Sequence, residues 1–262
     1  MNMPIPAGCL PQFLGLGVQK GGTTTLQRLL EQHPQVWLPP DKELHFFSLH
    51  YARGERWYAD RFAEAAPDQC CGDITPYYIF HPYAPQRIAE LLPDARLIVL
   101  LRDPVERCLS QYFHSCRLGL EHLGLEEALA SEQDRLLAAG LKLAELGATH
   151  RSHQEHSYLA RSRYEQQLAR YERRFSKNQL LLLKSEDLFE RQAVVWQRVL
   201  NFLELGPLPC PEGTTPANAG RGESADVPET LRLRLRELLQ STYRVMEKRY
   251  GITWSTSQKS AN

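Results

Sequence analysis

The chain has 262 residues, of which 42% are hydrophobic and 24% are charged, so one large α/β domain or at most two small ones would fit and could bury a substantial core. The 31 basic and 31 acidic side chains cancel, and no overall field attracts nucleic acid or an anionic membrane. The same balance weakly disfavours a long polyanion as a partner.

The first residues differ from a signal peptide. Met1 leads into Pro4, Pro6 and Pro11, with neither a basic segment nor a long apolar core. No stretch approaches the roughly 20 apolar residues that a bilayer span requires. The six cysteines include no C-x-x-C pair, and free thiols are typical of a reducing compartment. We therefore expect a cytoplasmic protein in which residues 1–12 form an N-terminal extension. The sequence indicates no oligomeric state.

Strands and helices alternate along residues 13–254, which we interpret as a single domain. Apolar runs predict strands, and leucines at helical spacing predict helices. The expected strands are Phe13–Val18, Val36–Leu38, Arg96–Leu101 and Gln179–Lys184. The expected helices are 23–32, a helix capped by Asp103 with Pro104 at its first position, helices within 121–147, then 163–175, 193–203 and 228–250. This order predicts a mostly parallel sheet with helices on both faces, with ligands at the carboxyl ends of the strands.

Three further segments are assigned by composition. Residues 121–160 form a helical region on the substrate side. Residues 206–228 are rich in Gly, Pro, Thr, Ser and Asn, and an irregular loop of this length in a compact domain is usually functional. Residues 255–262 form a tail.

A glycine-containing loop joins the first strand to the first helix. Glycines let the backbone approach an anion, and the first N–H groups of the helix point at it. Lys20 adds a positive charge at the tip of the loop, although a glycine turn with a solvated lysine is the alternative. The lysine precedes both glycines, whereas it follows the last glycine in a Walker A loop. The predicted anion site consists of Lys20, Gly21, Gly22, Thr23, Thr24 and Thr25.

A second anion site is predicted at the end of the most apolar strand. Arg102 follows that strand, and Ser110 lies on the next helix. An arginine can hold phosphate oxygens in a fork, and a serine can complete the contact. Asp103 would serve equally well as a simple helix cap, so this segment alone is weak evidence for an anion site. Two anion sites at two strand ends predict a ligand with two separated phosphates, such as a bisphosphorylated nucleotide.

A metal site is not expected. His150, His153 and His156 are closely spaced, but no matching set of carboxylates or cysteines accompanies them.

Together these motifs resemble the sulfotransferases that use 3′-phosphoadenosine 5′-phosphosulfate (PAPS). Residues 17–24 are similar to the family's 5′-phosphosulfate loop, and Arg102 with Ser110 and Tyr112 is similar to its 3′-phosphate site. Residues 42–47 resemble a segment of the heparan-sulfate-type enzymes and their bacterial relatives. Residues 75–78 and 184–188 resemble two later motifs of that branch.

The resemblance implies a P-loop-NTPase-like three-layer α/β fold and transfer of a sulfuryl group from PAPS to a hydroxyl, rather than an amine, without a metal. Such transfer needs in-line geometry and neutralisation of the leaving phosphate. Glu43 would be the base, and Lys20 would contact the bridging and sulfuryl oxygens. Arg221 and Gly222, in the loop 206–228, would cover the nucleotide.

The acceptor is inferred from departures from the heparan enzymes. Ile74 stands where those enzymes carry a lysine, and no disulfide pair surrounds Gly220 and Arg221. Both differences favour a cytoplasmic bacterial-type enzyme that acts on a small molecule, such as a natural-product alcohol of the cyanobacterial toxin kind. The expected acceptor-side residues are His45, Phe47, Thr75, Tyr77 and His114, of which His45 and His114 are also rival bases.

Three other functions stay open at this point. A carbohydrate sulfotransferase, a nucleotide kinase with an unusual phosphate loop and a non-catalytic nucleotide-binding module would each account for part of the pattern.

Overall fold

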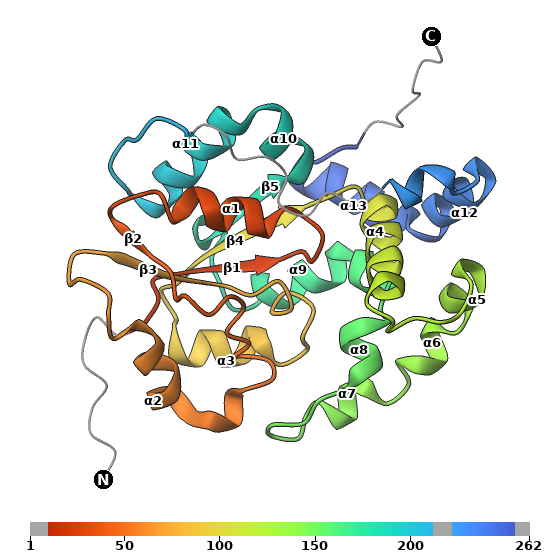
Figure 1. The fold of residues 1–262 in the computed structure, drawn as a ribbon, viewed down its shortest axis with the longest axis horizontal. Coiled ribbons are helices and arrows are strands. Elements are labelled where there is room, and N and C mark those ends of the chain that lie inside the picture. The colour runs from red at the N-terminus through yellow and green to blue at the C-terminus, as the bar shows by residue number, and fades with distance from the viewer. Residues whose placement is uncertain (1–9, 212–221, 255–262) are drawn as a thin grey trace.

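The computed structural model describes residues 10–211 and 222–254 (Figure 1). A parallel sheet of five strands, in the order β2-β3-β1-β4-β5, forms the centre of this part of the chain. The strands are β1 Phe13–Gly17, β2 Val36–Trp37, β3 Cys70–Ile74, β4 Arg96–Leu101 and β5 Leu180–Lys184. The parallel sheet and the three-layer fold expected from the sequence are confirmed.

Helices cover both faces of the sheet because alternate strand residues point to opposite sides. Leu14 and Leu16 of β1 belong to one apolar cluster, whereas Phe13 belongs to another. The first cluster includes side chains of α3 Ala84–Leu91, α9 Tyr164–Glu172 and α13 Gln240–Tyr250, and the second includes side chains of α1 Thr23–Leu30, α10 Ser185–Glu190 and α11 Gln192–Leu203. Figure 1 shows α1, α10 and α11 on one side of the sheet and α3 and α9 on the other.

The remaining helices lie mainly beyond the carboxyl ends of the strands, which point toward α4 in Figure 1. They are α2 Gly54–Ala59, α4 Pro104–Arg117, α5 Leu125–Ala130, α6 Glu132–Arg135, α7 Ala139–Lys142, α8 Arg151–Glu155 and α12 Glu229–Leu238, together with short 3-10 helices at Tyr51–Arg53, Asp60–Phe62, Ala160–Ser162, Lys177–Gln179 and Glu223–Asp226. None of the helices in residues 10–211 and 222–254 is long and apolar enough to cross a membrane.

The strand β3 was not predicted from the sequence. Its segment Cys-Cys-Gly-Asp-Ile carries a charge and a glycine, so it lacks an apolar run. Pairing with β2 on one side and β1 on the other makes it a strand. Gly72 lies opposite Phe13 of β1, and the Phe13 ring fills the space that a side chain at position 72 would need.

One helical prediction is confirmed and another is corrected. The expected helices within 121–147 are present and short, and Ala138, which precedes α7, has a left-handed backbone with φ 59°. The side chain of Glu132 turns inward and accepts hydrogen bonds from the N–H groups of Leu159 and Ala160. The final helix is broken at Leu239, where φ −104° and ψ 10° end α12 before α13 begins.

The predicted start of α4 is confirmed. Asp103 is the N-cap and accepts hydrogen bonds from the N–H groups of Val105 and Glu106, and Pro104 occupies the first turn. The cap fixes where α4 leaves the end of β4, immediately after Arg102.

The strand order determines which loops meet. Because β1 lies between β3 and β4, with Gly15 opposite Ile74 and Gly17 opposite Val99, three loops start side by side at the carboxyl edge of the sheet. These loops begin with Val18 after β1, Thr75 after β3 and Arg102 after β4.

Candidate functional site

The loop between β1 and α1 packs tightly against β4. The Val18 N–H donates to the Leu100 carbonyl at 2.7 Å, and the Gly21 N–H donates to the Val18 carbonyl at 2.9 Å. A Cβ on Gly21 would lie 2.7 Å from the Leu100 carbonyl oxygen, so this position has no room for a side chain. Gly22 is the N-cap of α1 with φ 96°, a backbone conformation that favours glycine. The glycines therefore hold the loop against the sheet, with the N-terminus of α1 directly after it.

Lys20 and Arg102 meet at this loop. The Arg102 Nη1 donates to the Lys20 carbonyl at 3.4 Å. Burial, together with the charges of Arg117, Arg102 and Lys42, lowers the pKa of Lys20 to about 8. The two anion sites predicted separately from the sequence are thus in direct contact. Burial and the neighbouring positive charges both disfavour the charged form of Lys20. A bound anion would favour the charged form again.

One face of α4 adds further charges. Ser110, His114 and Arg117 follow at spacings of four and three residues, which places them on one side of the helix. Burial lowers the pKa of His114, as do the charges of Lys20 and Arg117, whereas Glu43 opposes the shift. Arg117 was missed in the sequence analysis, although its helical spacing from Ser110 is a signal that would have found it. The assignment of Ser110 to the nucleotide stays a prediction.

The end of the predicted cofactor-covering loop lies beside α4. Gly222, with φ 89°, is the N-cap of the 3-10 helix Glu223–Asp226. Glu223 forms an ion pair with Arg117, with 2.7 Å between the Glu223 Oε1 and the Arg117 Nη1. Arg221, expected to contact the nucleotide, lies outside the described residues.

Glu43 lies in the loop that follows β2, with a left-handed backbone at φ 59°. Its carboxylate is 3.8 Å from the Lys42 Nζ and 3.6 Å from the His45 Nε2. Burial favours a higher pKa for Glu43, but the hydrogen bond with His45 and the charges of His45, Lys42 and Arg161 outweigh it and bring the pKa below its usual value. The carboxylate is therefore ionised at neutral pH.

A buried polar network at the end of β3 supports the loop that carries Glu43. The His45 N–H donates to the Thr75 hydroxyl at 3.4 Å, and that hydroxyl donates to Asp73 at 2.7 Å. Asp73 is only 1% exposed and also accepts hydrogen bonds from the hydroxyls of Tyr58 and Tyr78. Burial raises the pKa of Asp73, while these hydrogen bonds oppose the rise. The network links the end of β3 to the loop that carries the candidate base.

Three of the expected acceptor-side residues are buried. Phe47 and Thr75 are fully buried, and Tyr77 is 3% exposed. Phe47 packs edge-on against the rings of Tyr58 and Tyr78, and the Tyr77 hydroxyl lies 2.7 Å from the His153 Nδ1. These side chains pack within the core beneath the site, and their contact with an acceptor stays a prediction. His45 and His114 are half-buried and remain candidates for acceptor contacts.

The three closely spaced histidines have separate structural contacts. The His150 Nδ1 caps α8, His153 stacks on Phe80 at 4.2 Å between ring centroids, and the His156 Nε2 lies 3.0 Å from the Leu120 carbonyl. Among the described residues, no group of three or more His, Cys, Asp or Glu side chains is arranged to hold a metal ion. Cys70, Cys108, Cys116 and Cys210 are free thiols.

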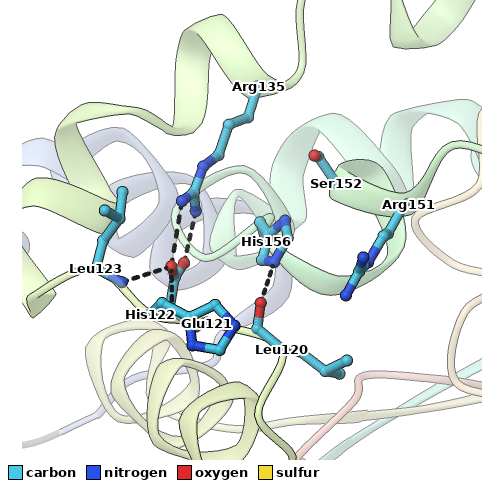
Figure 2. Close-up of a pocket in the computed structure, with 8 residues that line it drawn as sticks. All are labelled: Leu120, Glu121, His122, Leu123, Arg135, Arg151, Ser152 and His156. Atoms are coloured by element: carbon cyan, nitrogen blue, oxygen red, sulfur yellow. Dashed lines mark hydrogen bonds and ion pairs between the residues drawn. The ribbon is translucent and has the colours of Figure 1, made fainter.

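A pocket of about 460 Å³ lies between the end of α4, α6 and α8 (Figure 2). Glu121 lines this pocket, forms an ion pair with Arg135 and accepts a hydrogen bond from the Tyr158 hydroxyl at 2.7 Å. The lining residues are Leu120, Glu121, His122, Leu123, Arg135, Arg151, Ser152 and His156. All of them fall within or next to the region 121–160 that the sequence assigned to the substrate side, and the pocket begins three residues after Arg117.

The site as a whole can bind an anion and accept a proton. The side chains of Lys20, Arg102 and Arg117 supply positive charge near the N-terminus of α1, and an ionised carboxylate, Glu43, stands nearby. Cationic groups around a helix N-terminus favour phosphate or sulfate groups.

Comparison with known proteins places the chain among sulfotransferases. Residues 10–209 match the sulfotransferase domain family. The chain is 40% identical over 134 residues to the membrane-associated sulfotransferase kil1 of Dictyostelium discoideum, covering 46% of this chain and 28% of that protein. It is 41% identical over 103 residues to the human heparan sulfate glucosamine 3-O-sulfotransferase 3B1, covering 39% of this chain and 26% of that protein. The aligned segments thus cover less than a third of either relative.

Solved structures show the same fold. A sulfotransferase from Alicyclobacillus acidocaldarius superposes with a TM-score of 0.73 at 26% identity, covering 90% of this chain and 94% of that chain. The sulfotransferase domain of the Synechococcus PCC 7002 olefin synthase has a TM-score of 0.55 at 16% identity, covering 97% and 100%, and supports the fold alone. Since the family match spans residues 10–209 of 262, the chain belongs to the sulfotransferase family.

Proposed function

We propose that the protein transfers a sulfuryl group from PAPS to a hydroxyl of a small molecule, with Glu43 as the base. The contact between Lys20 and Arg102 is the observation that carries this proposal. It brings together two cationic segments from neighbouring strand ends, and a nucleotide with phosphates at both its 3′ and 5′ positions would use both. ATP, with all its phosphates on one side of the ribose, would not.

The residues present fit the donor. The N-terminus of α1 would hold the 5′-phosphate, and Arg102 with Ser110 would hold the 3′-phosphate. Lys20 would neutralise the charge that develops on the leaving phosphate oxygen as its bond to sulfur breaks. The acceptor oxygen forms the new bond to sulfur, and its proton passes to Glu43.

Glu43 is suited to this step because it is already ionised at neutral pH. Its position beside Lys42 and His45 lowers its pKa. This reduces its basicity but keeps it available for the proton of the attacking hydroxyl. His45 and His114 are the rival bases near the same site.

A small acceptor fits the pocket beyond α4. Its volume of about 460 Å³ falls in the range of about 300–1,000 Å³ that is usual for small-molecule sites. A carbohydrate hydroxyl is the second candidate, which the identity to the heparan sulfate enzymes favours.

The function is tested by product formation. With PAPS as donor, we expect the protein to sulfate small hydroxylated compounds, including natural-product alcohols, faster than N-sulfated heparan oligosaccharides. Mass spectrometry of the products from a mixed panel would measure both. Faster sulfation of the oligosaccharides would transfer the assignment to the carbohydrate function, and sulfation of neither class would contradict the proposal.

Nucleotide binding tests the two-phosphate site. Adenosine 3′,5′-bisphosphate should raise the melting temperature far more than AMP or ADP, because only it engages both anion sites. Arg102→Ala should reduce that shift strongly, since it removes charge-assisted hydrogen bonds. Arg28→Ala, on the exposed face of α1, is a matched control and should leave the shift unchanged. Equal shifts for the three nucleotides would contradict a 3′-phosphate site.

The lowered pKa of Lys20 predicts a pH dependence of nucleotide affinity. The charged lysine binds the anion, so affinity should be full below the pKa of about 8 in the free protein. As pH rises above that value, affinity should fall by at most about tenfold per pH unit. Calorimetric titration with the bisphosphate from neutral to alkaline pH would measure this. Lys20→Arg stays charged throughout, and its affinity should vary much less. An unchanged pH dependence in that variant would assign the titration to another group.

Glu43→Gln tests the base. The substitution keeps the shape of the side chain and removes its basicity, so kcat should fall by roughly 10²–10⁴-fold, the usual contribution of a general base. Affinity for the bisphosphate should stay close to that of the unsubstituted protein, because the amide does not change the anion sites. Near-normal turnover in Glu43→Gln, together with loss of turnover in His45→Ala or His114→Ala, would assign the role to a histidine.

A further inference from the structure

Among the described residues, Arg161 is a buried cation outside any direct ion pair. It is 4% exposed and forms no ion pair within the described part of the chain. Its Nη2 donates to the Gln154 carbonyl at 2.8 Å, and its guanidinium lies 4.8 Å and 5.1 Å from the ring centroids of Tyr77 and Phe80. Burial lowers the pKa of Arg161 to about 10. A buried charge left without a counterion is costly, so a functional reason is expected.

The remaining strong contact of Arg161 is with the loop between β1 and α1, which is called the phosphate loop below. Its Nη1 donates to the Gln19 Oε1 at 2.5 Å. A guanidinium has donors only, so this contact fixes which side of the amide faces Arg161. The Gln19 oxygen is turned toward Arg161, and the Nε2 with its two donor hydrogens is left on the other side. Gln19 immediately precedes Lys20, and its Nε2 has no protein partner in residues 10–211 and 222–254.

Arg161 also acts on the candidate base. Its charge and the Glu43 carboxylate stabilise each other, together with Lys42 and His45, which lie within 4 Å of that carboxylate. His114 of α4 interacts with Glu43 from another side of the site. One buried arginine thus contacts the phosphate loop and contributes to the field at Glu43.

Arg107 provides a contrast. It is also fully buried without an ion pair, but its donors go to Ser162, Gln111 and the Tyr158 carbonyl, all outside the phosphate loop. Burial of an arginine in this region therefore does not by itself produce contact with the site.

We propose that Arg161 is a positioning residue that acts through Gln19. It directs the Nε2 of the Gln19 side-chain amide toward an oxygen of the sulfuryl group held at the Lys20 loop. The inference rests on the proposed function, because it assigns the anion at this loop to the sulfuryl end of the donor. Gln19 becomes the residue that contacts the transferring group, and Arg161 holds its amide in one orientation.

The test is a double-mutant cycle on turnover. Arg161→Met and Gln19→Leu should each lower kcat by roughly 10- to 100-fold, as removal of an orienting group commonly does. Because both remove the same hydrogen bond to the sulfuryl group, the double variant should lose little more than either single variant. Affinity for adenosine 3′,5′-bisphosphate, which lacks the sulfuryl group, should change by less than about threefold in all three variants. Multiplying losses in the double variant would overturn the proposal.

Arg107→Met is the matched control, because it removes an equally buried arginine. Its effect on kcat should multiply with that of Gln19→Leu, since the two residues do not share a contact. If Arg161→Met does not fold, Arg161→Lys, which keeps the charge but not the planar fork, and Gln19→Leu, which leaves the buried arginine in place, complete the cycle. Normal kcat in Gln19→Leu would then overturn the proposal.

The pH profile of kcat/KM is an independent test of the effect of the Arg161 charge on Glu43. Loss of the Arg161 charge should move the acidic limb, assigned to Glu43, to higher pH, whereas Gln19→Leu should leave that limb in place. An unmoved limb in Arg161→Met would overturn the role of Arg161 in the field at Glu43. A protein without any PAPS turnover would overturn the proposed function itself, whereas normal turnover in Arg161→Met would overturn only this inference.

Discussion

The parallel pairing of β1 with β4 is the constraint on which the site depends. The pairing places Gly17 opposite Val99 and brings the Val18 N–H to the Leu100 carbonyl. The loop between β1 and α1 is consequently packed against the end of β4, with no room for a side chain at Gly21. Lys20 and Arg102 come into contact because their strands are neighbours, although 82 positions separate them in the sequence.

The cost of this arrangement is electrostatic. Lys20, Arg102 and Arg117 repel one another, and burial removes water from Lys20, so its pKa falls to about 8. Glu223 offsets part of the repulsion by pairing with Arg117. A site that holds several cations close together before any ligand arrives does not have to reorganise when an anion binds, which is the advantage of preorganised electrostatics.

The loop of the candidate base is supported from the other side of β1. Both Glu43 and His45 have left-handed backbones, a conformation that costs free energy for residues other than glycine. The contact from the His45 N–H to Thr75, and from Thr75 to the buried Asp73, links this loop to the end of β3. The central strand is thus flanked by one neighbour, β4, that leads to Arg102 and α4, and by another, β3, that supports the loop of the candidate base.

The sequence alone determined the features that local chemistry encodes. Apolar runs predicted four strands, the Asp-Pro pair predicted the start of α4, and glycines beside a lysine predicted the anion loop, because each depends on residues close together in the chain. The polar strand β3 was not predictable in this way, since its neighbours β1 and β2 make it a strand. The tertiary structure also decided that Phe47 and Thr75 are buried. Arg161 reaches Gln19 across 142 positions and Arg117 reaches Glu223 across 106. Contacts at such separations leave no local pattern, so only the folded chain reveals them.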